Sequence, residues 1–131
     1  MRALRTIARL LIGALVLFAG VMHLTPGGRK GFQVAVPDWV PLEPETTVVA
    51  SGVVEIALGA AVIATPPRCR SALGVVLAAF FVAVFPGNIA QWQHHRNSPG
   101  MRTDRARFIR LWLQPVLVIW ALWATRSDAR R

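Results

Sequence analysis

The chain is poor in charged residues and has almost no cysteine. Only 16% of its 131 residues are charged, against about 25% in ordinary soluble domains. Because 54% of the residues are hydrophobic, the chain is also too apolar to be disordered. Its one cysteine, Cys69, has no partner within the chain for a disulfide or a C-x-x-C redox pair. The composition therefore excludes a disordered protein and a self-contained thiol redox enzyme, and the length fits a single domain.

Motifs that mark common catalytic and metal sites are missing as well. The sequence has no H-E-x-x-H segment, no cysteine cluster and no glycine-rich phosphate loop. His94 and His95 are adjacent, so their side chains would point apart on a helix and would not share one metal ion. We therefore expect no catalytic residue and no metal site, and the sequence favours a role other than that of an enzyme.

The positive charge is distributed in short clusters. The formal net charge is +9, and Lys30 is the only lysine among 15 basic residues. Nucleic-acid binders carry such charge on a folded, water-facing surface, whereas these arginines stand between long apolar runs. We therefore expect a lipid bilayer as the partner and no nucleic acid. The preference for arginine over lysine is typical of GC-rich bacterial genomes.

Four apolar runs predict an all-α fold, a four-helix transmembrane bundle. They cover about residues 6–25, 45–65, 71–91 and 108–125. A helix of about 20 residues crosses a hydrocarbon core of about 30 Å, and lipid requires the backbone to be bonded within the segment. The first run resembles a signal peptide but lacks a convincing A-x-A cleavage site, so we expect it to remain as a span. Residues 1–131 then form a single transmembrane domain.

The connection between the first two runs is predicted to be a short interfacial segment. Phe32, Val36 and Trp39 would share one helical face, whereas Pro37 and Pro41 prevent a long continuous helix. Trp39 is expected at the depth of the lipid headgroups, where tryptophan is enriched.

The orientation of the bundle is weakly encoded. Eight basic residues lie on the side of the two termini and seven on the other side. The positive-inside rule therefore gives almost no preference for either orientation. The first helix usually weighs most in this rule, and it starts with Arg2, Arg5 and Arg9. We therefore expect both termini in the cytoplasm.

Glu55 is the most informative residue because it lies near the middle of the second run. An ionisable side chain at that depth is costly, so it normally faces the bundle interior and has a partner. We expect a buried, protonated carboxyl group that bonds to His23 or Asn88, because burial penalises the charged form. The sequence leaves open whether Glu55 is structural or binds a proton or a ligand.

Several further polar residues are expected to meet Glu55 in one half of the bundle. In an antiparallel bundle, the end of the first run lies beside the start of the second, and the end of the third beside the start of the fourth. Arg110 is expected mainly to reach the headgroups, with a role as counter-ion for Glu55 as the alternative. A few polar groups in an apolar wall resemble a ligand pocket. The candidate residues are His23, Ser51, Glu55, Asn88, Gln91, Arg110 and Gln114.

Four short segments have a characteristic order and spacing: GVMHL at 20–24, VPDWVP at 36–41, SGVVEIALG at 51–59 and VFPGNIA at 84–90. Together they resemble the DoxX-like family of small bacterial four-helix membrane proteins, over about residues 6–125. Gly87 is a departure, because the family often has alanine there. The resemblance implies a multi-pass protein of the bacterial cytoplasmic membrane. The family name comes from a quinone-linked sulfur-oxidation system, which makes a quinone the cofactor to consider; a related group carries paired cysteines that this chain lacks.

The favoured function is a non-enzymatic membrane module that binds a lipophilic small molecule, such as a quinone, or a redox partner protein. One alternative is a membrane subunit of an oxidoreductase complex. Another is a small proton-coupled transporter, for which four helices without an inverted repeat are few unless the chain forms a homo-oligomer.

Overall fold

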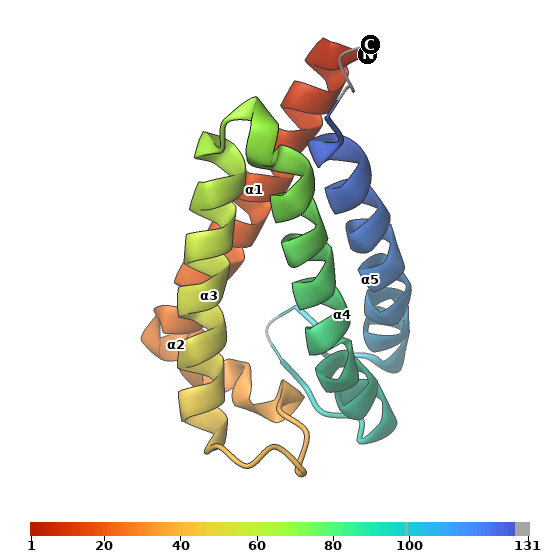
Figure 1. Ribbon diagram of the computed structural model, residues 1–131. Helices are drawn as coiled ribbons and strands as arrows, with labels where there is room; N and C mark the ends of the chain where they lie inside the picture. The colour runs from red at the N-terminus through yellow and green to blue at the C-terminus, as the bar shows by residue number, and fades with distance from the viewer. Residues whose placement is uncertain (99, 128–131) are drawn as a thin grey trace.

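The computed structural model describes residues 1–98 and 100–127, and almost all of its regular structure is helical (Figure 1). Within these residues the only β-type pairing is an isolated bridge between Ser98 and Met101. Two short 3-10 helices, η1 (Gln33–Ala35) and η2 (Pro67–Cys69), lie in the connections. The α-helices are α1 (Arg2–Leu24), α2 (Pro26–Gly31), α3 (Pro44–Ala64), α4 (Arg70–Gln93) and α5 (Asp104–Thr125).

Four helices are long and apolar enough to cross a membrane: α1, α3, α4 with the preceding η2, and α5. They run alternately up and down, so α1 begins and α5 ends at the same end of the bundle (Figure 1). We call this the terminal end, and the opposite end, which carries α2, η1 and the α4–α5 connection, the loop end. The predicted all-α four-helix bundle is confirmed, and the four long apolar helices indicate a multi-pass membrane protein.

Two helices begin earlier than the apolar runs predicted. α1 starts at Arg2 and α5 at Asp104, each about one turn before the expected start. Each added turn contains charged residues. Hydropathy therefore identifies the length of chain that suits lipid, which is shorter than the length that is helical. The start of α5 is fixed locally, because the Thr103 hydroxyl oxygen accepts a hydrogen bond from the Ala106 N–H at 3.1 Å.

The connection between α1 and α3 contains two short helical pieces and no long helix, and its position at the membrane interface stays a prediction. Thr25 separates α1 from α2, and its hydroxyl oxygen accepts a hydrogen bond from the Gly28 N–H at 3.1 Å. Pro26 occupies the first turn of α2, where its missing N–H costs nothing. The chain beyond η1 is irregular up to α3. The depth of Trp39, which is 73% exposed, stays a prediction.

α1 and α3 pack at very short range because glycines on the two helices face one another. A Cβ atom added at Gly59 would lie 2.7 Å from the backbone oxygen of Gly13. One added at Gly20 would lie 2.7 Å from the backbone oxygen of Gly52. Backbone atoms cannot rotate aside as a side chain can, so these positions allow an approach that larger residues would prevent. The end of α1 is thereby held against the middle of α3.

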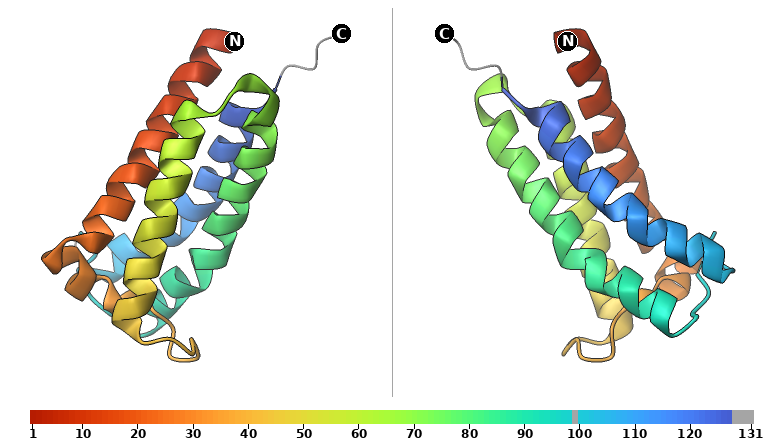
Figure 2. Two further views of the ribbon diagram at one scale, coloured as in Figure 1. Left: turned by 60° about the vertical axis from the view of Figure 1, so that its left-hand side comes forward. Right: turned by 90° about the vertical axis from the view of Figure 1, so that its right-hand side faces the viewer.

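α4 and α5 form the second half of the bundle and lie side by side (Figure 2). The Trp120 indole N–H donates to the Ala8 carbonyl at 2.9 Å and so joins α5 to α1. At the loop end, η1 approaches α4 closely, since a Cβ atom at Gly87 would lie 2.6 Å from the Ala35 oxygen. The two halves share one apolar core, which consists of Ile12, Val16, Val62, Leu77, Ala78, Phe81 and Ala121.

The glycine contacts between α1 and α3 can be tested with a single methyl group. We expect Gly59→Ala to lower the free energy of unfolding by about 1–3 kcal/mol, the usual cost of overpacking a close contact. The measurement is thermal unfolding of the purified protein in mild detergent, followed by circular dichroism. Gly27→Ala is the matched control, because no atom lies within 4 Å of the added Cβ. A Gly59→Ala protein as stable as the control would contradict this account of the packing.

Candidate functional site: a polar pocket at the loop end

A pocket of about 240 Å³ lies at the loop end of the bundle. Its wall includes residues from α1, α3, α4 and α5, from η1, and from the chain that follows η1. Much of the lining is apolar, with Phe32, Val48 and Met101 among its members. Six of the seven polar residues that the sequence singled out also line it, and they are His23, Ser51, Glu55, Asn88, Gln91 and Arg110.

The pair of His23 and Glu55 joins α1 to α3 within this pocket. His23 Nδ1 and Glu55 Oε2 are hydrogen-bonded, and the two side chains are 18% and 12% exposed. The Phe32 ring packs edge-on against the imidazole, with ring centroids 4.5 Å apart. The structure thus gives Glu55 the first of its two expected partners. An imidazolium with a carboxylate and a neutral imidazole with a carboxylic acid differ only in the position of one proton, and protonation of Glu55 stays a prediction.

Gln114 does not line the pocket itself but bonds to two residues of the opposite wall, Asn88 and Arg110. Its side chain is fully buried, and its Nε2 donates to the Phe81 carbonyl of α4 at 2.7 Å. Its Oε1 accepts from Asn88 Nδ2 at 3.2 Å and from Arg110 Nη1 at 2.6 Å. Asn88, the second expected partner of Glu55, therefore bonds to α5 instead. Gln114 holds both donors in place for the pocket.

Arg110 is held against the bundle, and its expected reach to the lipid headgroups stays a prediction. Its guanidinium is part-buried and donates to Gln114, and the side chain lines the same pocket as Glu55. The structure therefore places Arg110 and Glu55 in the lining of one pocket, and the role of Arg110 as a counter-ion for Glu55 stays a prediction.

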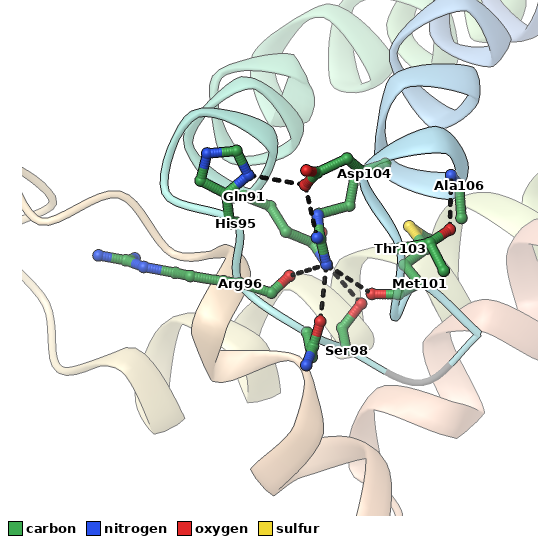
Figure 3. A network of polar contacts seen from close by, with 10 residues as sticks. Gln91, His95, Arg96, Ser98, Met101, Thr103, Asp104 and Ala106 are labelled. Atoms are coloured by element: carbon green, nitrogen blue, oxygen red, sulfur yellow. Dashed lines mark hydrogen bonds and ion pairs between the residues drawn. The ribbon is translucent and has the colours of Figure 1, made fainter.

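Gln91 connects the pocket to a network of polar contacts in the α4–α5 connection (Figure 3). Its side-chain amide donates to Ser98 Oγ at 2.6 Å and to the Arg96 carbonyl at 3.2 Å. The buried Arg107 donates from Nη2 to Asp104 at 2.6 Å and from Nη1 to the same Arg96 carbonyl at 3.3 Å. These contacts fix the shape of the connection that covers this side of the pocket.

A second arginine of this connection ties it to the chain after η1. Arg96 Nη2 lies 3.1 Å from a carboxylate oxygen of Asp38. Its Nη1 donates to the carbonyls of Val34 and Val36 at 3.3 and 3.4 Å. Two connections that are about 60 residues apart in the chain thus meet at one guanidinium. The loop-end wall of the pocket is therefore a cross-linked structure rather than two independent loops.

The sequence did not predict that Arg96 and Arg107 hold together the connections around the pocket. Both looked like ordinary charges in a polar loop, and nothing in their spacing distinguishes them from the exposed Arg102 and Arg105. Phe32 was assigned to the interfacial segment but not to the pocket. The one available signal was the predicted proximity of that segment to the start of the second span.

A bundle of four membrane-length helices with a polar pocket at one end defines a small multi-pass membrane protein. The chain belongs to a family that is described only as a domain of unknown function (DUF8561), which matches residues 12–125. This match includes every residue of the pocket and most of all four spans. Comparison with curated proteins gave no match, and comparison with solved structures gave none. Among the described residues, no group of three or more His, Cys, Asp or Glu is arranged to hold a metal ion.

Two substitutions at Glu55 separate the loss of its charge from the loss of its hydrogen bond. Glu55→Gln retains a partner for His23, so we expect its stability to match that of the unchanged protein. Glu55→Leu leaves a part-buried imidazole without its partner, so we expect the free energy of unfolding to fall by about 1–3 kcal/mol. Thermal unfolding in detergent measures both.

Glu43→Gln is the matched control, because Glu43 is an exposed carboxylate next to the start of α3. It should leave the melting temperature unchanged. If Glu55→Leu unfolds at the same temperature as this control, the pair with His23 contributes nothing to the fold.

Proposed function

We propose that this protein is a non-enzymatic membrane module that binds a lipophilic small molecule with a hydrogen-bond-accepting head, of which a quinone is the leading example. The supporting observation is that His23, Glu55, Asn88 and Arg110 line a single pocket with apolar walls. A quinone head is a flat, largely apolar ring with two carbonyl acceptors. Arg110 and Asn88 supply donors on one side of the pocket, and the His23–Glu55 pair supplies a proton-bearing group on the other.

The size of the pocket agrees with binding of a head group rather than of a whole lipid. Pockets that enclose a drug-sized molecule have volumes of about 300–1,000 Å³, and this one has about 240 Å³. A single substituted ring fits such a space, and an isoprenoid tail does not. The tail would therefore lie between the helices and the lipid.

The His23–Glu55 pair suits a ligand that exchanges protons. The proton between an imidazole and a carboxyl group can lie on either partner. A quinone that takes up two electrons from a redox partner protein also takes up two protons to become a quinol. In this proposal the redox chemistry belongs to the partner protein, and the His23–Glu55 pair provides a hydrogen-bonding group for a ring oxygen of the bound quinone or quinol.

The same proposal includes membership of the DoxX-like group and a location in the bacterial cytoplasmic membrane. Each of the four segments that carry the resemblance contributes to the pocket, although they are far apart in the sequence. His23 comes from the first segment, Trp39 from the second, Glu55 from the third and Asn88 from the fourth.

Binding of a short-tailed ubiquinone analogue to the full chain in lipid nanodiscs tests the function. Quenching of tryptophan fluorescence reports binding, because Trp39 lines the pocket. We expect saturable quenching, and we expect Arg110→Gln to raise the Kd about 10- to 100-fold, since a charged donor is lost. Arg105→Gln is the matched control, because Arg105 is an exposed arginine on the same helix. Circular dichroism spectra of both variants establish that they are folded.

Two outcomes would count against quinone binding. One is quenching that does not saturate in the unchanged protein. The other is an equal Kd for Arg110→Gln and Arg105→Gln. Mass spectrometry of lipids extracted from the purified protein gives an independent measurement, in which a stoichiometric quinone is the expected result.

The orientation is tested with an alkaline phosphatase fusion after Arg131. We expect no periplasmic activity there, because the three arginines at the start of α1 favour cytoplasmic termini. A fusion that replaces the chain after His94 follows the third span, so it should be active and serves as the positive control. The reverse pattern of activities would show that the termini face the periplasm.

A further inference from the structure

A second hollow lies at the terminal end of the bundle, at the opposite end from the polar pocket. It has a volume of about 760 Å³ and forms where α1 begins, α3 ends, η2 leads into α4, and α5 ends. Pro66, Pro67 and Ala124 supply apolar parts of its wall. Its charged lining consists of six arginines, which are Arg2, Arg5, Arg9, Arg68, Arg70 and Arg126.

The described lining of the hollow contains several arginines and no aspartate or glutamate. The aspartate and glutamate residues that the structure describes lie elsewhere. Glu55 lines the polar pocket, and the other four lie at the loop end: Asp38, Glu43, Glu45 and Asp104. Such a concentration of like charge in a concave surface attracts an anion strongly.

Two of the arginines are fixed in place by the ends of helices. The Arg9 side chain is buried, and its Nη1 donates to the carbonyls of Val62 and Ile63 in the last turn of α3, at 2.6 and 2.7 Å. Arg70 Nε donates to the Thr65 carbonyl at 3.2 Å. These bonds satisfy carbonyls that the helix itself leaves unpaired. They also hold both charges in position before any ligand arrives.

Two other arginines are exposed and have donors to offer. Arg68 and Arg126 are both exposed at the rim of the hollow. Within residues 1–98 and 100–127, neither guanidinium makes a hydrogen bond or an ion pair, although the Arg126 backbone oxygen accepts one from Arg5. A guanidinium presents parallel N–H groups whose spacing matches two oxygens of a phosphate.

We propose that this hollow binds the phosphate of an anionic phospholipid headgroup. It lies where all four spans begin or end, which is the depth of the headgroup layer. Basic pockets between transmembrane helices are a known arrangement for anionic headgroups. The prolines and Ala124 offer an apolar surface to the glycerol and the first methylenes of the lipid, which a free phosphate would leave unused.

Native mass spectrometry of the full chain in mild detergent tests the site. The probes are phosphatidylglycerol and phosphatidylcholine with identical acyl chains, and inorganic pyrophosphate as the soluble source of phosphate. We expect preferential retention of phosphatidylglycerol. Each arginine near an anionic headgroup contributes about fivefold in affinity, so Arg68→Gln with Arg126→Gln should weaken retention about 25-fold.

The matched control removes the same charge from the other end of the bundle. Arg102→Gln with Arg105→Gln changes two exposed arginines at the loop end and should leave retention of phosphatidylglycerol unchanged. If the double variant at Arg68 and Arg126 does not fold, Arg68→Gln alone is measured against Arg105→Gln alone, with about a fivefold loss expected.

Three results would overturn the proposal. They are equal retention of the two lipids, an equal loss in the two double variants, and binding of pyrophosphate without any preference for phosphatidylglycerol. The quinone titration on the same variants is independent of this outcome, because the substitutions lie outside the pocket that contains His23 and Glu55.

Discussion

The close contact of α1 with α3 is the constraint on which the rest of this structure depends. Facing glycines, Gly20 against Gly52 and Gly13 against Gly59, let the two backbones touch. Only at this separation does the His23 imidazole at the end of α1 reach the carboxyl group of Glu55 within α3. A carboxyl group at such a depth without a partner is costly. The small residues therefore make the ionisable residue in the middle of α3 tolerable, and the site follows from the packing.

The bundle consists of two tightly packed pairs, and the pocket lies between them. The glycine contacts and the His23–Glu55 bond hold α1 to α3, while Gln114 holds α5 to α4 through Phe81 and Asn88. α3 packs against α4 far less closely than against α1. The polar side chains mostly bond to partners within their own pair of helices. The space between the two pairs of helices therefore stays open. This explains how so many polar side chains can line a hollow and still have partners.

The sequence predicted the spans and the residues of the pocket better than it predicted their contacts. Hydropathy and length determine the spans, and antiparallel order brings together the ends that carry His23, Asn88 and Arg110. The pairing of Asn88 with Gln114 and the inward direction of Arg110 depend on how each helix is rotated about its axis. A helix that is apolar on all sides gives little periodicity from which to read that rotation. The burial of Arg9 was missed for a related reason, because its partners are backbone carbonyls that carry no sequence signal.

The two ends of the bundle differ in charge in a way that counting basic residues does not reveal. The sequence divides them almost evenly, yet at the loop end Arg96 pairs with Asp38, Arg107 with Asp104, and Arg29 lies 3.8 Å from Glu45. Of these pairs, Arg96 with Asp38 joins the two connections beside the pocket. At the terminal end the arginines line a hollow to which the described residues contribute no carboxylate. Nearly equal numbers of basic residues therefore have different surroundings: several at the loop end pair with carboxylates, whereas six at the terminal end line one hollow.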